Sequence, residues 1–137
     1  MNISKKKKEE FDSILNFVEP NNIIINIDLF REKLFNSDFY DIFIDYTKNK
    51  IENIAIDNDF FYLHVNIVSF KLSDLYHYDK ILKISKLFHK FTKKLEKIFI
   101  YGSSNLFQNL ISMLNESLNF KIEKKFIFKD EVDMVIV

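Results

Sequence analysis

Cysteine is absent from the 137 residues of this chain. Its absence excludes disulfide bonds, thiolate metal ligands and a thiol nucleophile, and it fits a reducing compartment. We therefore expect a cytoplasmic protein. The three histidines, His64, His77 and His89, lie far apart and lack the i, i+4 pair that a zinc-binding helix uses. The sequence accordingly predicts neither a metal site nor a cofactor.

An excess of charge of one sign is also missing, because 20 basic side chains balance 20 acidic ones. No overall field therefore draws the protein toward nucleic acid or an anionic membrane. Arg31 is the single arginine among the basic residues. A guanidinium group is what grips a phosphate or a guanine edge with two parallel hydrogen bonds, so sequence-specific readout of nucleic acid is disfavoured.

Long hydrophobic runs are absent as well. Lys, Asp or Glu interrupts every apolar segment before it reaches the length of a membrane span. The opening MNISKKKKEE is basic, but the uninterrupted apolar core of a signal peptide does not follow it. We therefore expect no membrane insertion.

Apolar bulk, by contrast, is plentiful, since 47% of the residues are hydrophobic, including 16 Phe and 6 Tyr. A chain of this length can bury a sizeable core as one domain. We expect residues 1–20 to form a separate piece, in which a solvated tail through Glu9 precedes a short helix over FDSILNFV that Pro20 ends. Residues 21–137 are expected to form a single α/β domain.

The segment before the central strands contains one ambiguous pattern. Ile23–Ile27 is a β-branched run that predicts a strand, and Asp28 can cap a short helix after it. Residues 39–47 fit either a helix or a strand, because their apolar side chains recur at helical spacing and also at alternate positions. We favour the helix, with Ser37 as its N-cap. The alternative is a strand that pairs with IENIAID as a hairpin.

Two strand-to-helix units follow. Phe60–Val68 is dense in aromatic and β-branched residues and predicts a strand, and Ser73–Leu95 predicts an amphipathic helix. Ile98–Tyr101 predicts the next strand, Gly102 a turn, and Leu106–Leu118 another helix. KIEKKFIFK and VDMVIV are further strand candidates. This order predicts an α/β fold in which helices pack on a small mixed β-sheet.

The turns between these strands and helices supply the candidate sites. Ser69, Ser73, Asp74 and Tyr76 are the candidate partner-binding residues, because we expect this turn to project them from an ordered scaffold. Ser73 can cap the following helix, or alternatively accept a phosphate. A second candidate, for an anion, is the turn formed by Gly102, Ser103 and Ser104.

The long helix also carries lysines opposite its apolar face. This stripe consists of Lys83, Lys86, Lys90 and Lys94. It can follow a phosphate backbone, which makes a nucleic-acid-associated accessory protein one alternative, although no aromatic residue interleaves the stripe to stack bases. Another alternative is a homo-oligomeric structural component that uses the Phe-rich strands and Val132–Val137 as a self-complementary interface.

The turn after the central strand also carries a family resemblance. Val68-Ser69-Phe70 ends the strand, Ser73 lies in the turn, and a long helix, a strand and a further helix follow. In this order the segment from Phe60 to Phe120 resembles the STAS domain, the fold of bacterial anti-sigma-factor antagonists and related regulatory modules. That family has a V-x-F strand end followed by a D-S-x-G-L turn.

The STAS resemblance implies a function as well as a fold. Ser73 matches the serine that is phosphorylated in many members, whereas Leu72 and Leu75 replace the Asp and Gly of the motif. A non-enzymatic regulatory module that binds another protein is therefore expected. Its partner class would include a serine-kinase-type anti-sigma factor or a larger signalling assembly, and modification of Ser73 would switch the contact.

Overall fold

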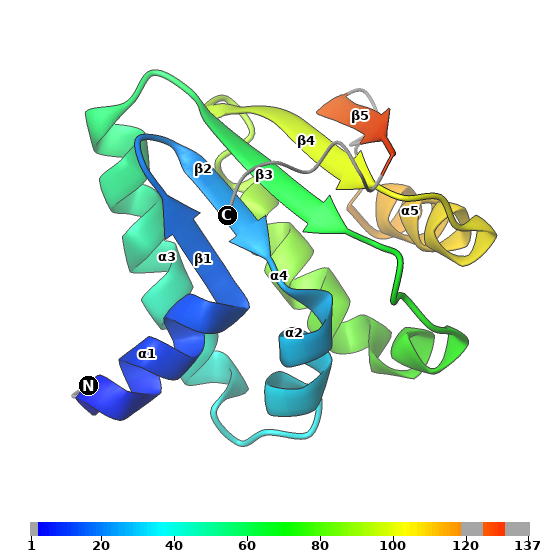
Figure 1. Ribbon diagram of the computed structural model, residues 1–137, viewed down its shortest axis with the longest axis horizontal. Helices are drawn as coiled ribbons and strands as arrows, with labels where there is room; N and C mark the ends of the chain where they lie inside the picture. The colour runs from blue at the N-terminus through cyan, green and yellow to red at the C-terminus, as the bar shows by residue number, and fades with distance from the viewer. Residues whose placement is uncertain (1–2, 119–124, 131–137) are drawn as a thin grey trace.

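The computed structural model describes residues 3–118 and 125–130, and within them five strands form one mixed sheet that is packed with helices (Figure 1). The strands are β1 (Leu15–Val18), β2 (Asn22–Ile25), β3 (Phe61–Asn66), β4 (Leu95–Tyr101) and β5 (Phe126–Lys129). The helices are α1 (Lys5–Ile14), α2 (Ile27–Leu34), α3 (Tyr40–Asp57), α4 (Tyr78–His89) and α5 (Asn105–Leu118), with a 3₁₀ helix η1 (Leu72–His77) before α4. The predicted α/β class is confirmed.

The strand order of the sheet follows the chain, β1-β2-β3-β4-β5. β1 and β2 are antiparallel, and each later strand is parallel to the one before it. Parallel neighbours need a crossover, and α2 with α3, then α4, then α5 provide the three crossovers. Because the carboxyl ends of parallel strands meet at one edge, the segments that follow β2, β3 and β4 lie along one rim of the sheet.

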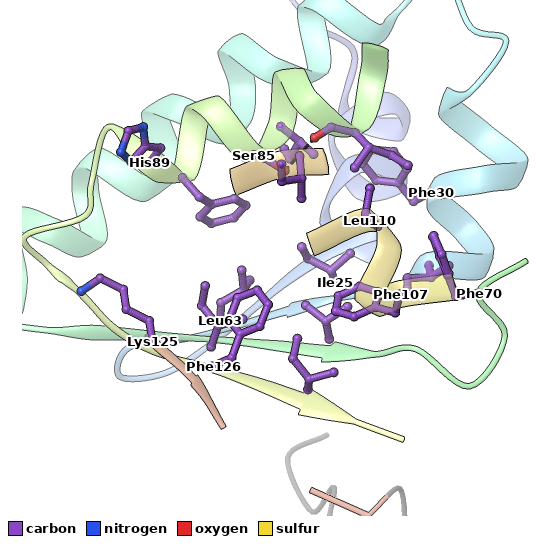
Figure 2. A pocket seen from close by; sticks show the side chains of 18 of the residues that line it. Ile25, Phe30, Leu63, Phe70, Ser85, His89, Phe107, Leu110, Lys125 and Phe126 are labelled. Atoms are coloured by element: carbon purple, nitrogen blue, oxygen red, sulfur yellow. Dashed lines mark hydrogen bonds between the residues drawn. The ribbon is translucent and has the colours of Figure 1, made fainter. Parts of the chain in front are cut away.

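The strand register gathers apolar side chains into rows on the face that packs against the helices. Successive side chains of a strand point to opposite faces, so in-register alternate residues share a face. Two of these rows are Ile23-Leu63-Ile98 and Ile25-Val65-Ile100. Helices lie on one side of the sheet, and side chains from α4 and α5 meet these rows (Figure 2).

The ambiguous segment at residues 39–47 is helical, and the hairpin alternative is wrong. It forms the first half of α3, and IENIAID continues the same helix. The buried stripe of α3 consists of Tyr40, Phe43, Thr47 and Ile51, at spacings of three and four. Phe39 occupies the N-cap position, and Ser37 accepts a hydrogen bond from the Phe39 N–H at 3.0 Å in the turn before it.

The first 20 residues share the sheet and the core with the rest of the chain. Ser4 caps α1 by accepting a hydrogen bond from the Lys7 N–H at 3.1 Å, so the lysine run is helical instead of forming a solvated tail. The helix ends at Ile14, and Leu15–Val18 pairs with β2. The expected helix over FDSILNFV is therefore wrong in its second half, because the ladder with β2 captures those residues.

Two other helix boundaries differ from the predicted ones. Asn26, and not Asp28, caps α2, because its side-chain oxygen accepts a hydrogen bond from the Leu29 N–H at 3.0 Å. The predicted helix over Ser73–Leu95 divides into η1, α4 and a tight turn, since Leu95 pairs with Phe61 in the sheet. The expected strand within KIEKKFIFK is β5, whereas VDMVIV lies outside the described residues.

Candidate functional site

An ion pair between Arg31 and Asp74 holds the turn after β3 against α2. Nε and Nη2 of Arg31 donate to the two carboxylate oxygens of Asp74, each at 2.7 Å. The Lys71 N–H donates to the same carboxylate at 2.8 Å, and Arg31 Nη2 also donates to the Ser69 carbonyl at 2.8 Å. The single arginine of the chain thus holds this turn in place from the inside through a bidentate contact with the carboxylate.

Asp74 does not project toward solvent, which corrects the prediction that it belongs to an exposed docking surface. Its side chain is 2% exposed. Burial acts to raise the pKa of Asp74, but hydrogen bonds from Arg31 and from the Lys71 N–H, together with the Arg31 charge, outweigh burial and lower it. A buried carboxylate needs such partners, and α2 supplies the cation from 43 residues away in the chain.

The same turn leaves apolar side chains in solvent. Val68, Leu72 and Tyr76 are 55%, 60% and 82% exposed, and they are three of the eight large hydrophobic side chains that are exposed among the described residues. Ser73 is exposed between them. We call Val68, Leu72, Ser73 and Tyr76 the rim surface. Three large apolar side chains exposed along residues 68–76 favour an interaction site there.

Ser73 does not cap the helix that follows it. Lys71 occupies the N-cap position of η1, and its N–H donates to the Asp74 carboxylate. The capping role that one interpretation gave to Ser73 therefore belongs to Asp74. Ser69 contributes its backbone carbonyl to the Arg31 contact. Of the four candidate partner-binding residues, Ser73 and Tyr76 are the two that are exposed.

The predicted anion-binding turn lies against the rim surface. Gly102 has a φ of +106°, and a Cβ added there would meet Cγ2 of Val68 at 2.9 Å, so both the backbone conformation and the close approach require glycine. The Ser104 hydroxyl accepts a hydrogen bond from the Phe107 N–H at 3.1 Å and so caps α5. Ser103 is exposed.

The predicted lysine stripe does not form one continuous track. Its members are Lys83 and Lys86 on α4, Lys90 just after α4, and Lys94 in the turn before β4. Lys83 pairs with Asp41 of α3. Lys94 donates to the carbonyls of Ala55 at 2.7 Å and Asn58 at 3.1 Å, so it anchors the loop after α3. The stripe is broken because the helix ends at His89.

A buried polar network centred on His64 of β3 was not predicted from the sequence. His64 is 2% exposed, its Nδ1 lies 2.9 Å from the Tyr101 hydroxyl, and its Nε2 lies 2.8 Å from Oδ1 of Asn22. Because an amide oxygen only accepts, Nε2 carries the proton and Nδ1 accepts from the tyrosine. The ring also stacks on Phe99 at 5.0 Å between centroids. The signal in the sequence is the alternation of Tyr62, His64 and Asn66.

The burial of His64 leads us to predict how the stability of the protein depends on pH. Burial, and then the charge of Lys129, lowers the pKa of His64. The neutral His64 ring therefore makes its full contribution to the free energy of unfolding above the ordinary pKa of about 6.5. This contribution is lost as the pH falls through the lower pKa of the folded state. We expect the free energy of unfolding, measured by urea titration, to decline from pH 7 to pH 5, and to decline less steeply in His64→Gln. Equal slopes in both proteins would contradict this.

Comparison with protein-family models, with curated proteins and with solved structures finds no match for this chain. Within residues 3–118 and 125–130, no three His, Cys, Asp or Glu side chains gather to hold a metal ion. Across the same residues, no helix has both the length and the apolar character that crossing a bilayer requires. The candidate site is therefore defined by the geometry of the rim surface and the ion pair beneath it.

Proposed function

We propose that this protein is a non-enzymatic regulatory module that binds another protein through the rim surface. The observation that carries this proposal is the exposure of Val68, Leu72 and Tyr76 on a turn that the Arg31–Asp74 pair fixes from below. Neither feature alone would suffice, because isolated exposed apolar side chains are common on protein surfaces. Exposed apolar side chains on a turn that an ion pair holds in place together favour the binding of a partner protein.

The Arg31–Asp74 ion pair, which holds the turn in place, supports the proposal energetically. A turn that is already ordered loses little conformational entropy when a partner binds, so more of the contact energy appears as affinity. Tyrosine is enriched among the few interface residues that carry most binding energy, and Tyr76 is 82% exposed. We therefore assign Tyr76 as the anchor of the interface, with Leu72 and Val68 as further contacts on the same turn.

The position of Ser73 supports control of this contact by phosphorylation. Its hydroxyl is exposed, and the neighbouring Asp74 carboxylate is already paired with Arg31, which reduces its repulsion of a phosphate. A phosphate brings close to two negative charges at neutral pH into a surface where Leu72 and Tyr76 are apolar. A partner would have to desolvate that charge, so modification weakens docking.

The order of the elements is consistent with the STAS resemblance. β3, the turn with η1, α4, β4 and α5 follow one another as that family's strand, turn, helix, strand and helix do. This agreement supports a partner of the class that the resemblance implies, such as a serine-kinase-type anti-sigma factor. Leu72, which stands in place of the motif's Asp, is part of the apolar rim surface instead.

Affinity capture with the full chain, followed by mass identification and calorimetry with the captured partner, tests the proposal. We expect Tyr76→Ala to weaken the affinity at least tenfold, about 1.4 kcal/mol, and Ser73→Glu to weaken it to a similar extent. Ile56→Ala is the matched control, because Ile56 is 79% exposed but lies on α3. It should bind the partner as the wild type does.

Two outcomes separate the parts of this proposal. If both Tyr76→Ala and Ser73→Glu bind the partner with wild-type affinity, then the rim surface is not the docking site. If Tyr76→Ala weakens binding and Ser73→Glu does not, the docking site stands and the phosphoswitch is removed.

A further inference from the structure

A cavity of about 160 Å³ lies between the helix-facing side of the sheet, α4 and α5 (Figure 2). Leu63 and Ile98 of the sheet form its floor, and Phe88 of α4 and Leu110 of α5 form other walls. Protein interiors are close-packed and leave few voids larger than a water molecule. This space opens partly to solvent, and its lining is mostly apolar, so it can admit a small molecule.

Water is a poor occupant of this cavity, because a buried water needs two to four polar partners. The polar side chains of its described lining are those of Asp74, Ser85, His89, Thr92 and Lys125, and three of them are engaged elsewhere. Ser85 donates to the Ile81 carbonyl at 2.8 Å, Asp74 is paired with Arg31, and Lys125 donates to the Leu95 carbonyl at 2.8 Å. Among the described residues, no buried side-chain nitrogen or oxygen lacks a hydrogen-bond partner.

We propose that this cavity binds a small, uncharged apolar molecule of roughly six to ten non-hydrogen atoms. The size follows from a measured precedent in another protein, in which an apolar cavity of about 150 Å³ takes up benzene. The walls lack dispersion partners where the space is empty, and an apolar occupant restores those contacts. Apart from Asp74, His89 and Lys125, the described residues of the lining carry no charge, so most of the cavity favours an uncharged ligand.

The cavity also reaches the back of the turn that follows β3. Phe70, which lines it, packs edge-on against Phe107 of α5 at 5.7 Å between ring centroids. The binding site therefore lies beneath the rim surface but does not include its exposed side chains. This inference does not depend on the proposed docking function, and the test below uses no protein partner.

Titration of the full chain with benzene, followed by two-dimensional NMR, tests the proposal in the wild type. We expect saturable shifts with a dissociation constant on the order of 1 mM and nuclear Overhauser contacts from benzene to the methyl groups of Leu63 and Leu110. Benzoate, of the same shape but charged, is expected to bind more weakly than benzene, because its carboxylate would leave water for a lining that is mostly apolar. Absence of saturation with benzene, contacts at another place, or equal binding of benzoate would overturn the proposal.

A pair of variants gives a second, independent measurement. Leu110→Ala enlarges the cavity, so we expect it to bind indole, which has nine non-hydrogen atoms, at least tenfold more tightly than the wild type does. Leu34→Ala is the matched control, because Leu34 is buried in the core but does not line this cavity. Its affinity for indole should equal that of the wild type. Equal gains in both variants would contradict the assignment of the site.

Discussion

Arg31→Met is expected to lower the free energy of unfolding by about 3 kcal/mol. Removing one partner of a buried ion pair leaves the other charge uncompensated, which costs roughly 3–5 kcal/mol. We place the expected loss at the lower end because the Arg31 side chain is 20% exposed, whereas that of Asp74 is 2% exposed. Urea denaturation followed by circular dichroism at pH 7 measures the change.

Lys33→Met is the matched control for this prediction. Lys33 lies on the same helix as Arg31, and its only ion pair among the described residues is a contact of 3.7 Å with the exposed neighbour Glu32. Such surface pairs contribute little, so a change within about 0.5 kcal/mol is expected. Arg31→Lys should fall between the two, since it keeps the charge and loses the bidentate contact. If Arg31→Met unfolds as Lys33→Met does, the ion pair does not hold the turn.

Phe11→Ala is expected to destabilise the protein by about 3–5 kcal/mol, the usual cost of removing a buried phenyl ring. Phe11 is 1% exposed, and its ring packs edge-on against Phe43 at 5.2 Å and beside Tyr46 at 5.5 Å between centroids. The loss of these contacts leaves a cavity between α1 and α3. The same urea titration measures the effect.

The control for the Phe11 prediction is Ile56→Ala. Ile56 is 79% exposed on α3, so its truncation creates no cavity and should change stability by about 0.5 kcal/mol or less. A small effect of Phe11→Ala, comparable with that of Ile56→Ala, would indicate that the N-terminal helix is a separate piece. A large effect shows that it belongs to the common core.

Local patterns in the sequence predicted the elements whose periodicity is not overridden by pairing with a distant strand. β3 and α5 were predicted near their observed positions, and α3 was correctly preferred over the hairpin. Gly102 was expected at a turn, and its positive φ and its approach to Val68 explain why glycine is needed. These signals are local, because they depend on residues a few positions apart.

The predicted helix boundaries are wrong where a distant strand pairs with the same residues. Leu95 continues a helical spacing, but it pairs with Phe61 and begins β4. Leu15 also fits a helical stripe, yet it pairs with Ile25 in the sheet. In both places a ladder of backbone hydrogen bonds to another strand overrides the local periodicity, and nothing in the local pattern records the partner strand.

The candidate site shows the same division. Its place in the chain was predictable, because a turn between a strand and a helix is where side chains are presented. The side chains that the site presents could not be predicted. Asp74 points inward and pairs with Arg31 of α2, while Leu72 and Tyr76 remain exposed to solvent.

The amino-acid sequence by itself determined the alternation of strands and helices, the α/β class and the position of the turn that bears Ser73. Only the tertiary structure decided which charges are buried, where the long helix ends and that the N-terminal residues join the sheet. The physical reason is that periodicity and capping act over a few residues, whereas burial, ion pairing and strand register depend on groups that meet only when the chain is folded.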